Sequence, residues 1–237
     1  MKNTLLLIFT FLLLGFSETR AQSVDAFFNQ AETFFSKNVA NGKVAYKAIH
    51  SNPEVLNQLM ESASKITLGG ADAKTTQAFW INAYNLAVIK GVVDNYPIKS
   101  PLDKAGFFDK TKYNLGGTSI TLNAIENKML RAKYNDARFH FVLVCGAIGC
   151  PPIIPKAYKP STLDSQLKTQ ATKALNNKNF IKVSDSKVEL SEIFKWYQED
   201  FVKQGSEIDY INTFRSDKIS EDAKISYYPY DWRLNEQ

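Results

Sequence analysis

Residues 78–89 read Ala78-Phe79-Trp80-Ile81-Asn82-Ala83-Tyr84-Asn85-Leu86-Ala87-Val88-Ile89 and are apolar except at Asn82 and Asn85. Asp72 can cap a helix that contains this run, and Tyr96-Pro97 ends it. A helix that is apolar on all sides must be buried. The two Asn are three residues apart and share a helix face, so they either tie down neighbouring backbone or line a polar site.

The residues on either side of this helix predict further helices and short strands. Apolar spacing and capping residues predict helices over 24–39, 53–64, 123–132, 163–176, 191–201 and 208–214. Turn residues at 116–117 and 184–186 predict two hairpins, and β-rich runs predict strands over 139–144 and 224–228. We therefore expect one α+β domain over residues 22–237. Its N-terminal half is helical, and a small, mostly antiparallel sheet carries the segment from His140 to Cys150.

The first 21 residues have the pattern of a secretory signal peptide. A positive charge at Lys2 precedes an apolar run from Leu5 to Phe16, which is too short to span a bilayer. Thr19-Arg20-Ala21 offers small residues for cleavage after Ala21. This pattern predicts a periplasmic or secreted protein with no membrane span after cleavage, in a compartment where disulfides persist.

Composition narrows the possible functions. The chain has 237 residues, of which 44% are hydrophobic and 13% aromatic, so it is not a disordered protein. Its 29 Lys and Arg are scattered, which predicts a solvated surface and no nucleic-acid partner. With only 2 His and 2 Cys, few places remain for nucleophilic or metal chemistry. We expect no cofactor, and a small molecule or peptide as the partner.

Both Cys and one His lie in the single stretch Arg138-Phe139-His140-Phe141-Val142-Leu143-Val144-Cys145-Gly146-Ala147-Ile148-Gly149-Cys150-Pro151-Pro152. Four interpretations of this stretch compete. Cys145 and Cys150 form a local disulfide, as paired Cys in exported chains usually do. Alternatively they form a redox dithiol, although the spacing is not C-x-x-C. They could also bind a metal together with His140 and Glu126.

The fourth interpretation is a cysteine nucleophile assisted by His140. Cys145 is the better candidate, because Gly146 and Ala147 offer free N–H groups for an oxyanion hole, whereas prolines follow Cys150. One objection comes from geometry. His140 and Cys145 are five residues apart, so in a regular strand they would point to opposite faces. They meet only where the strand bends or ends before Cys145.

The C-terminal residues Tyr230-Asp231-Trp232-Arg233-Leu234-Asn235 keep aromatic side chains close to the end of the chain, which predicts that this segment docks on the domain. Asp231 could orient a histidine, or pair with Arg131 or Arg233. Glu126 and Arg131 are five residues apart on their predicted helix and do not share a face well, so each should pair with other elements.

Five motifs in chain order resemble the domain-of-unknown-function family 547. They are Phe79-Trp80-Ile81-Asn82-Ala83-Tyr84-Asn85, Ile125-Glu126 with Leu130-Arg131, His140-Phe141 with Cys145-Gly146-Ala147 and Cys150-Pro151-Pro152, Ile193-Phe194-Lys195-Trp196-Tyr197 with Asp200-Phe201, and Tyr230-Asp231-Trp232 with Leu234-Asn235. The resemblance covers about residues 45–235. A His often follows the Glu of the third helix in this family, whereas this chain has Asn127, which weakens a metal site.

The resemblance also implies members inside cells with the same two cysteines, which favours a functional Cys/His site over a structural disulfide. Our first hypothesis is therefore an exported cysteine hydrolase or acyl transferase that acts on an amide or thioester bond. Its predicted catalytic residues are Cys145, His140, Asp231 and Glu126. The alternative is a non-catalytic cell-envelope ligand-binding domain with a Cys145–Cys150 disulfide. The residues expected to bind ligand or to support the site are Asn82, Asn85, Tyr84, Arg131, Gly146, Cys150, Tyr230 and Trp232.

Overall fold

Helix α4, Ala73–Asp94, lies at the centre of the fold, and nearly all of its residues from Ala78 to Val93 are buried. The computed structural model describes residues 23–184, 186–203 and 205–237, so the predicted signal peptide lies outside the described residues. Asp72 caps α4 as predicted, because its carboxylate accepts a hydrogen bond from the backbone N–H of Thr75 at 2.8 Å. Mixed helices and small sheets around α4 confirm the α+β class. No helix within the described ranges is long and apolar enough to cross a membrane.

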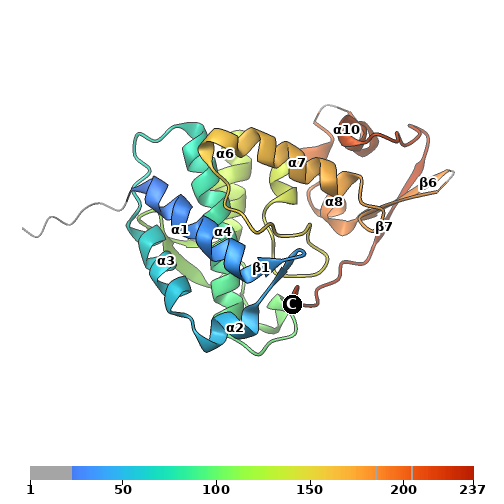
Figure 1. Cartoon of the computed structure of the whole chain (residues 1–237). Helices are drawn as coiled ribbons and strands as arrows, with labels where there is room; N and C mark the ends of the chain where they lie inside the picture. Colours follow the sequence, from blue (N-terminus) through green and yellow to red (C-terminus); the bar gives the residue numbers. More distant parts are fainter. Residues whose placement is uncertain (1–22, 185, 204) are drawn as a thin grey trace, which may run out of the picture.

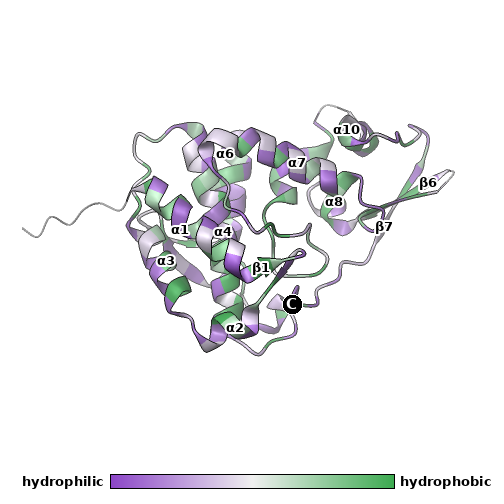
Figure 2. Ribbon diagram, in the orientation of Figure 1, coloured by the Kyte–Doolittle hydropathy of each residue, from purple (hydrophilic) through white to green (hydrophobic). Residues whose placement is uncertain are grey.

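Three outer helices cover α4 on the N-terminal side of the molecule (Figure 1). They are α1 (Val24–Asn38), α2 (Tyr46–Ser51) and α3 (Glu54–Lys65). Helix α1 buries Phe27, Phe34 and Phe35 against the core. Figure 2 shows hydrophilic and hydrophobic residues together on α1, as expected for a helix with one buried side. Helix α2 and the short strands β1 (Val39–Ala40) and β2 (Lys43–Val44) were not predicted.

The hairpin of β3 (Lys112–Leu115) and β4 (Thr118–Thr121) confirms the first predicted hairpin. Both turn glycines, Gly116 and Gly117, have positive φ, which is the backbone conformation that a two-residue hairpin turn of this kind requires. Their N–H groups donate to the carbonyls of Ala63 and Ser64 at the end of α3. The turn therefore satisfies carbonyl groups that the helix end leaves without partners.

The predicted helix over 123–132 exists, but its central part is a π-helix, η2 (Ile125–Arg131), between α5 (Leu122–Ala124) and α6 (Ala132–Tyr134). π-helical turns are rare and occur often at functional sites. Element η2 packs directly on α4. Glu126 and Arg131 both lie on it, and the wider turn changes which side chains share a face.

The C-terminal half joins short helices to a three-stranded sheet. The helices are η4 (Pro160–Thr162), α7 (Leu163–Leu175), α8 (Glu192–Trp196), α9 (Gln198–Phe201) and α10 (Glu207–Phe214), and η1 (Pro101–Asp103) precedes β3. Strand β5 (Ile181–Ser184) pairs antiparallel with β6 (Lys187–Ser191), and β7 (Lys224–Tyr228) pairs parallel with β6. From β7 the chain returns to β1 and β2, beside which it ends (Figure 1).

The prediction of a strand over 139–144 was wrong. These residues begin in a 3-10 helix, η3 (Ala137–Phe141), and continue as a loop. The side chain of Asn85 replaces a neighbouring strand, because it donates to the Val142 carbonyl and accepts from the Val144 N–H, both at 2.9 Å. Consequently the segment from His140 to Cys150 does not belong to any sheet of the described residues, contrary to expectation. It forms only an isolated bridge between Ala147 and Leu234.

Candidate functional site

A cavity of about 330 Å³ lies where η2, η3, α4, α8 and the C-terminal segment meet. We call it the disulfide pocket, because Cys145 and Cys150 lie in its wall. Most of its lining is aromatic or aliphatic. The lining residues that matter below are Tyr84, Glu126, His140, Cys145, Cys150, Trp196, Tyr197, Tyr230 and Trp232.

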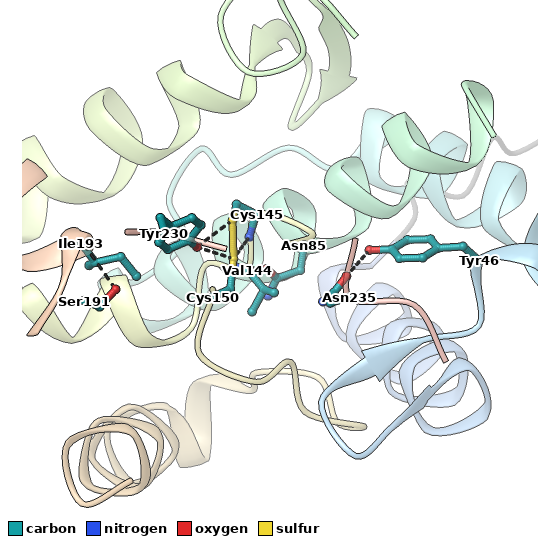
Figure 3. The surroundings of a disulfide bond; sticks show 9 residues. All are labelled: Tyr46, Asn85, Val144, Cys145, Cys150, Ser191, Ile193, Tyr230 and Asn235. Carbon is teal, nitrogen blue, oxygen red and sulfur yellow. Dashed lines mark hydrogen bonds between the residues drawn. A yellow bond between two sulfur atoms is a disulfide. The ribbon is translucent and has the colours of Figure 1, made fainter. Parts of the chain in front are cut away.

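The two cysteines are bonded to each other, with their Cα atoms 6.4 Å apart. The Tyr230 hydroxyl lies 3.1 Å from Cys145 Sγ and 3.0 Å from Cys150 Sγ. Dashed lines in Figure 3 mark these contacts. Because a disulfide sulfur carries no proton, the hydroxyl is the donor in both contacts. The Cys145 N–H also donates to Cys150 Sγ at 2.9 Å. The bond between the cysteines agrees with the first of the four interpretations of this segment.

The loop from Cys145 to Cys150, which we call the cysteine loop, is held by hydrogen bonds on two sides. Asn85 on α4 holds the backbone just before Cys145 (Figure 3). The C-terminal segment holds the loop itself, because Ile148 N–H donates to the Arg233 carbonyl and Gly149 N–H to the Asp231 carbonyl, both at 2.8 Å. The C-terminal segment therefore docks on the domain, as its aromatic composition predicted. The docked chain brings Tyr230 and Trp232 to the pocket.

His140 is almost fully buried, and both of its ring nitrogens face carboxylates. Nε2 lies 2.8 Å from Asp200 Oδ2, and Nδ1 lies 3.8 Å from Glu126 Oε1. The ring stacks on Tyr197 with centroids 4.1 Å apart. In the described residues no hydrogen bond joins His140 to either sulfur, although the histidine and both cysteines line the same pocket.

Asp200 on α9 is the residue that orients His140. Burial raises the pKa of this carboxyl group, but hydrogen bonds from His140, Arg131 and Lys203 outweigh burial and hold the pKa well below its usual range. Asp200 is therefore ionised and accepts the Nε2 proton of His140, so Nδ1 faces the Glu126 side of the pocket. Arg131 also lies over the Tyr197 ring, with its guanidinium carbon 4.8 Å from the ring centroid.

The structure brings together seven of the predicted site residues. Glu126, His140, Cys145, Cys150, Tyr84, Tyr230 and Trp232 all line the disulfide pocket. Since the predicted strand is absent, the geometric objection to placing His140 and Cys145 on one site no longer applies. Cys145 does not present a free thiol while the disulfide is intact.

Five predicted residues lie outside the lining. Asn82 ties backbone groups, because it bonds the Ala78 carbonyl and both the N–H and the carbonyl of Tyr158. Asn85 likewise bonds backbone groups, the Val142 carbonyl and the Val144 N–H, which lead into the cysteine loop.

Asp231 does not orient the histidine. It is bound by Arg233, and Asp200 takes the place predicted for it. Gly146 has positive φ and packs near Val88 and Pro101, so it supports the loop and does not line the pocket. Arg131 pairs with Asp200 and Glu199, which agrees with its predicted pairing to other elements.

Sequence reasoning missed Asp200, Tyr197 and Trp196 as site residues. The signal that could have identified them was present, because Trp196-Tyr197 and Asp200 belong to one of the family-like motifs. Within the described ranges, no group of three or more His, Cys, Asp or Glu side chains is arranged to hold a metal ion.

Comparison with known proteins supports the family resemblance over part of the chain. No curated protein and no solved structure matches the sequence. A family match spans residues 68–175, from just before α4 to the end of α7, and so includes Glu126, His140 and both cysteines. Asp200 and Tyr230 lie beyond it. Residues 68–175 match the family described as Protein of unknown function, DUF547.

Proposed function

We propose that this protein is a ligand-binding domain of the cell envelope, with an intact Cys145–Cys150 disulfide in the wall of its binding pocket. Its ligand is a small molecule with an apolar, ring-like body and a positively charged group. The observation that carries this proposal is the disulfide pocket itself, an aromatic cavity with one carboxylate among the lining residues. The envelope location rests on the predicted signal peptide.

The size and lining of the pocket suit a small ligand. Its volume of about 330 Å³ lies at the lower end of the usual range for ligand sites. Trp196, Tyr230 and Trp232 pack together, with ring centroids 4.8 to 5.9 Å apart. Trp196 is nevertheless 44% exposed, so this aromatic wall leaves apolar surface for a ligand to cover.

Glu126 gives the pocket its charge preference. Burial, and after it the negative charge of Glu126, raises the pKa of Tyr84 and of Tyr197 well above the usual value. The tyrosines therefore stay neutral, and Glu126 is the only Asp or Glu among the lining residues of the described chain. A carboxylate in a mainly aromatic cavity favours a cationic ligand group, because both the charge and the ring faces attract it.

Phenethylamine tests this preference, and phenethyl alcohol, which lacks the positive charge, is its neutral counterpart. We expect calorimetry to show that wild-type protein binds the amine more tightly than the alcohol. Glu126→Gln should weaken amine binding about tenfold or more, the factor that corresponds to 1.4 kcal/mol. The exposed Glu54→Gln is the matched control and should bind like wild type. Equal binding of both probes, or an unchanged affinity in Glu126→Gln, contradicts the proposal.

A second candidate is the cysteine hydrolase or acyl transferase, which requires Cys145 to be a free thiol in the native protein. The observation that favours it is the His140–Asp200 pair, since a carboxylate that orients a histidine beside a cavity is typical of nucleophilic enzymes. Cys145 lines the same cavity. Iodoacetamide labelling of the native exported protein without reductant tests this candidate. If neither cysteine is labelled, the nucleophile is absent under these conditions and the candidate fails.

A further inference from the structure

We propose that the disulfide pocket carries out thiol–disulfide exchange with a small thiol, in a fixed direction: the thiol attacks Cys145 Sγ, and Cys150 leaves as the thiolate. In this step the S–S bond between the cysteines breaks, and a bond forms between the incoming sulfur and Cys145 Sγ. A second thiolate then attacks the sulfur that came from the first thiol and releases Cys145 as a thiolate. Each small thiol loses its proton to solvent before its thiolate attacks. In total, two thiols lose two electrons and two protons and become one disulfide, and the two cysteines gain the electrons and take up protons from solvent as their thiolates become thiols.

Exposure selects the sulfur that is attacked. Both cysteines line the pocket, but Cys150 is only 9% exposed, whereas Cys145 is half-buried. Thiol–disulfide exchange requires the incoming sulfur to reach the sulfur that it attacks. A small thiol in the pocket therefore reaches Cys145 more readily.

Hydrogen bonding selects the sulfur that leaves. Cys150 Sγ accepts hydrogen bonds from the Cys145 N–H at 2.9 Å and from the Tyr230 hydroxyl at 3.0 Å. Cys145 Sγ has one such donor, the same Tyr230 hydroxyl at 3.1 Å. Donors to a sulfur stabilise its thiolate, and a more stable thiolate leaves faster. Exposure and hydrogen bonding thus assign the same direction.

Tyr230 is placed to serve whichever sulfur becomes charged. In the described residues its hydroxyl has no hydrogen-bond partner other than the two sulfurs, so its proton is available to both. Burial raises the pKa of Tyr230, so the hydroxyl keeps this proton. The residue is held firmly, because its N–H donates to Glu192 at 2.9 Å and a Cβ on Gly149 would lie 2.9 Å from its ring.

This inference goes beyond the proposed ligand binding and does not depend on the charge preference of the pocket. If phenethylamine fails to bind but exchange follows the predicted direction, only the proposed function is lost. If exchange fails while Glu126→Gln weakens amine binding, only the exchange reaction is lost.

The first test uses native wild-type protein and 2-mercaptoethanol at pH 7, with rapid acid quenching and peptide mass spectrometry. We expect the transient mixed disulfide on Cys145, with Cys150 present as a thiol. Tyr230→Phe keeps the ring and should slow the reaction about tenfold, as expected for the loss of one hydrogen bond to a charged group. Tyr228→Phe, whose hydroxyl bonds the Phe180 carbonyl, is the matched control and should react at the wild-type rate.

The second test uses single-cysteine variants and does not require the disulfide. In the Cys145→Ala variant, Cys150 keeps both of its hydrogen-bond donors. The pH dependence of its alkylation by iodoacetamide should therefore give a lower apparent pKa than Cys145 gives in the Cys150→Ala variant. Adding Tyr230→Phe to Cys145→Ala should raise that apparent pKa. The proposal is overturned by a mixed disulfide on Cys150, by equal adducts on both cysteines, or by reaction only after unfolding. A reversed order of the two apparent pKa values overturns it as well.

Discussion

Replacing Asn85 by Ala tests whether one side chain on α4 holds the backbone that leads into the disulfide. The amide of Asn85 satisfies the Val142 carbonyl and the Val144 N–H, each at 2.9 Å, and Asn85 is 2% exposed. Its removal leaves one buried acceptor and one buried donor without a partner, at a cost of about 1–3 kcal/mol each. Alanine offsets this loss by about 0.7 kcal/mol, because its helix propensity is higher than that of asparagine. We therefore expect Asn85→Ala to lower the free energy of unfolding by about 1–5 kcal/mol.

Urea denaturation followed by circular dichroism measures this free energy, provided that the slope against urea stays at its wild-type value. Asn29→Ala is the matched control. It makes the same substitution at an exposed position of α1, where only the higher helix propensity of alanine acts, so it should raise the free energy of unfolding by about 0.7 kcal/mol or less. A loss below about 1 kcal/mol in Asn85→Ala would refute the reasoning, because the two backbone groups would then have found other partners.

Two further predictions concern the groups that position the histidine and the disulfide. The pKa of Asp200 is lower in the folded protein than its value of about 3.9 in the unfolded chain. The ionised carboxylate therefore stabilises the fold at pH values above about 3.9. This stabilisation is lost as the pH falls from there through the pKa of the folded state. Urea denaturation at pH 7 should give Asp200→Asn a lower free energy of unfolding than wild type. The difference between the two free energies should shrink between about pH 5 and pH 2, and a difference that stays constant with pH would contradict the role of Asp200. Gly149→Ala should displace the Tyr230 ring, which a Cβ would approach to 2.9 Å, and so change the near-UV circular dichroism and slow exchange with 2-mercaptoethanol. Gly69→Ala, where a Cβ meets nothing within 4 Å, should change neither property.

Local sequence patterns predicted the elements that form largely by themselves. The run from Ala78 to Ile89 predicted a buried helix because helical periodicity leaves no polar side. Gly116-Gly117 predicted the first hairpin because the turn needs two residues with positive φ. Such signals depend on backbone preferences of a few neighbouring residues.

The segment from Phe139 to Val144 shows where this approach fails. A short, continuously apolar run satisfies a buried strand and a buried helical turn equally well, so periodicity does not separate them. What decides the conformation is where its backbone groups find partners, and here Asn85, more than fifty residues earlier, supplies two of them. The same Asn was already expected either to tie down backbone or to line a polar site, but the sequence does not say which backbone it binds.

The scarcity of His and Cys predicted the location of the site better than its chemistry. Counting placed it between His140 and Cys150, and the pocket lies there. The chemistry depends on residues that the count did not include, because Asp200 fixes the proton on His140 and Tyr230 donates to both sulfurs. Asp200 lies 60 positions after His140, and Tyr230 lies 80 positions after Cys150, so local sequence patterns reveal neither contact. The nitrogens of His140 face Asp200 and Glu126, and no hydrogen bond of the described residues joins this histidine to either sulfur of the disulfide. The sulfurs therefore depend on Tyr230 and a backbone N–H for their reactivity.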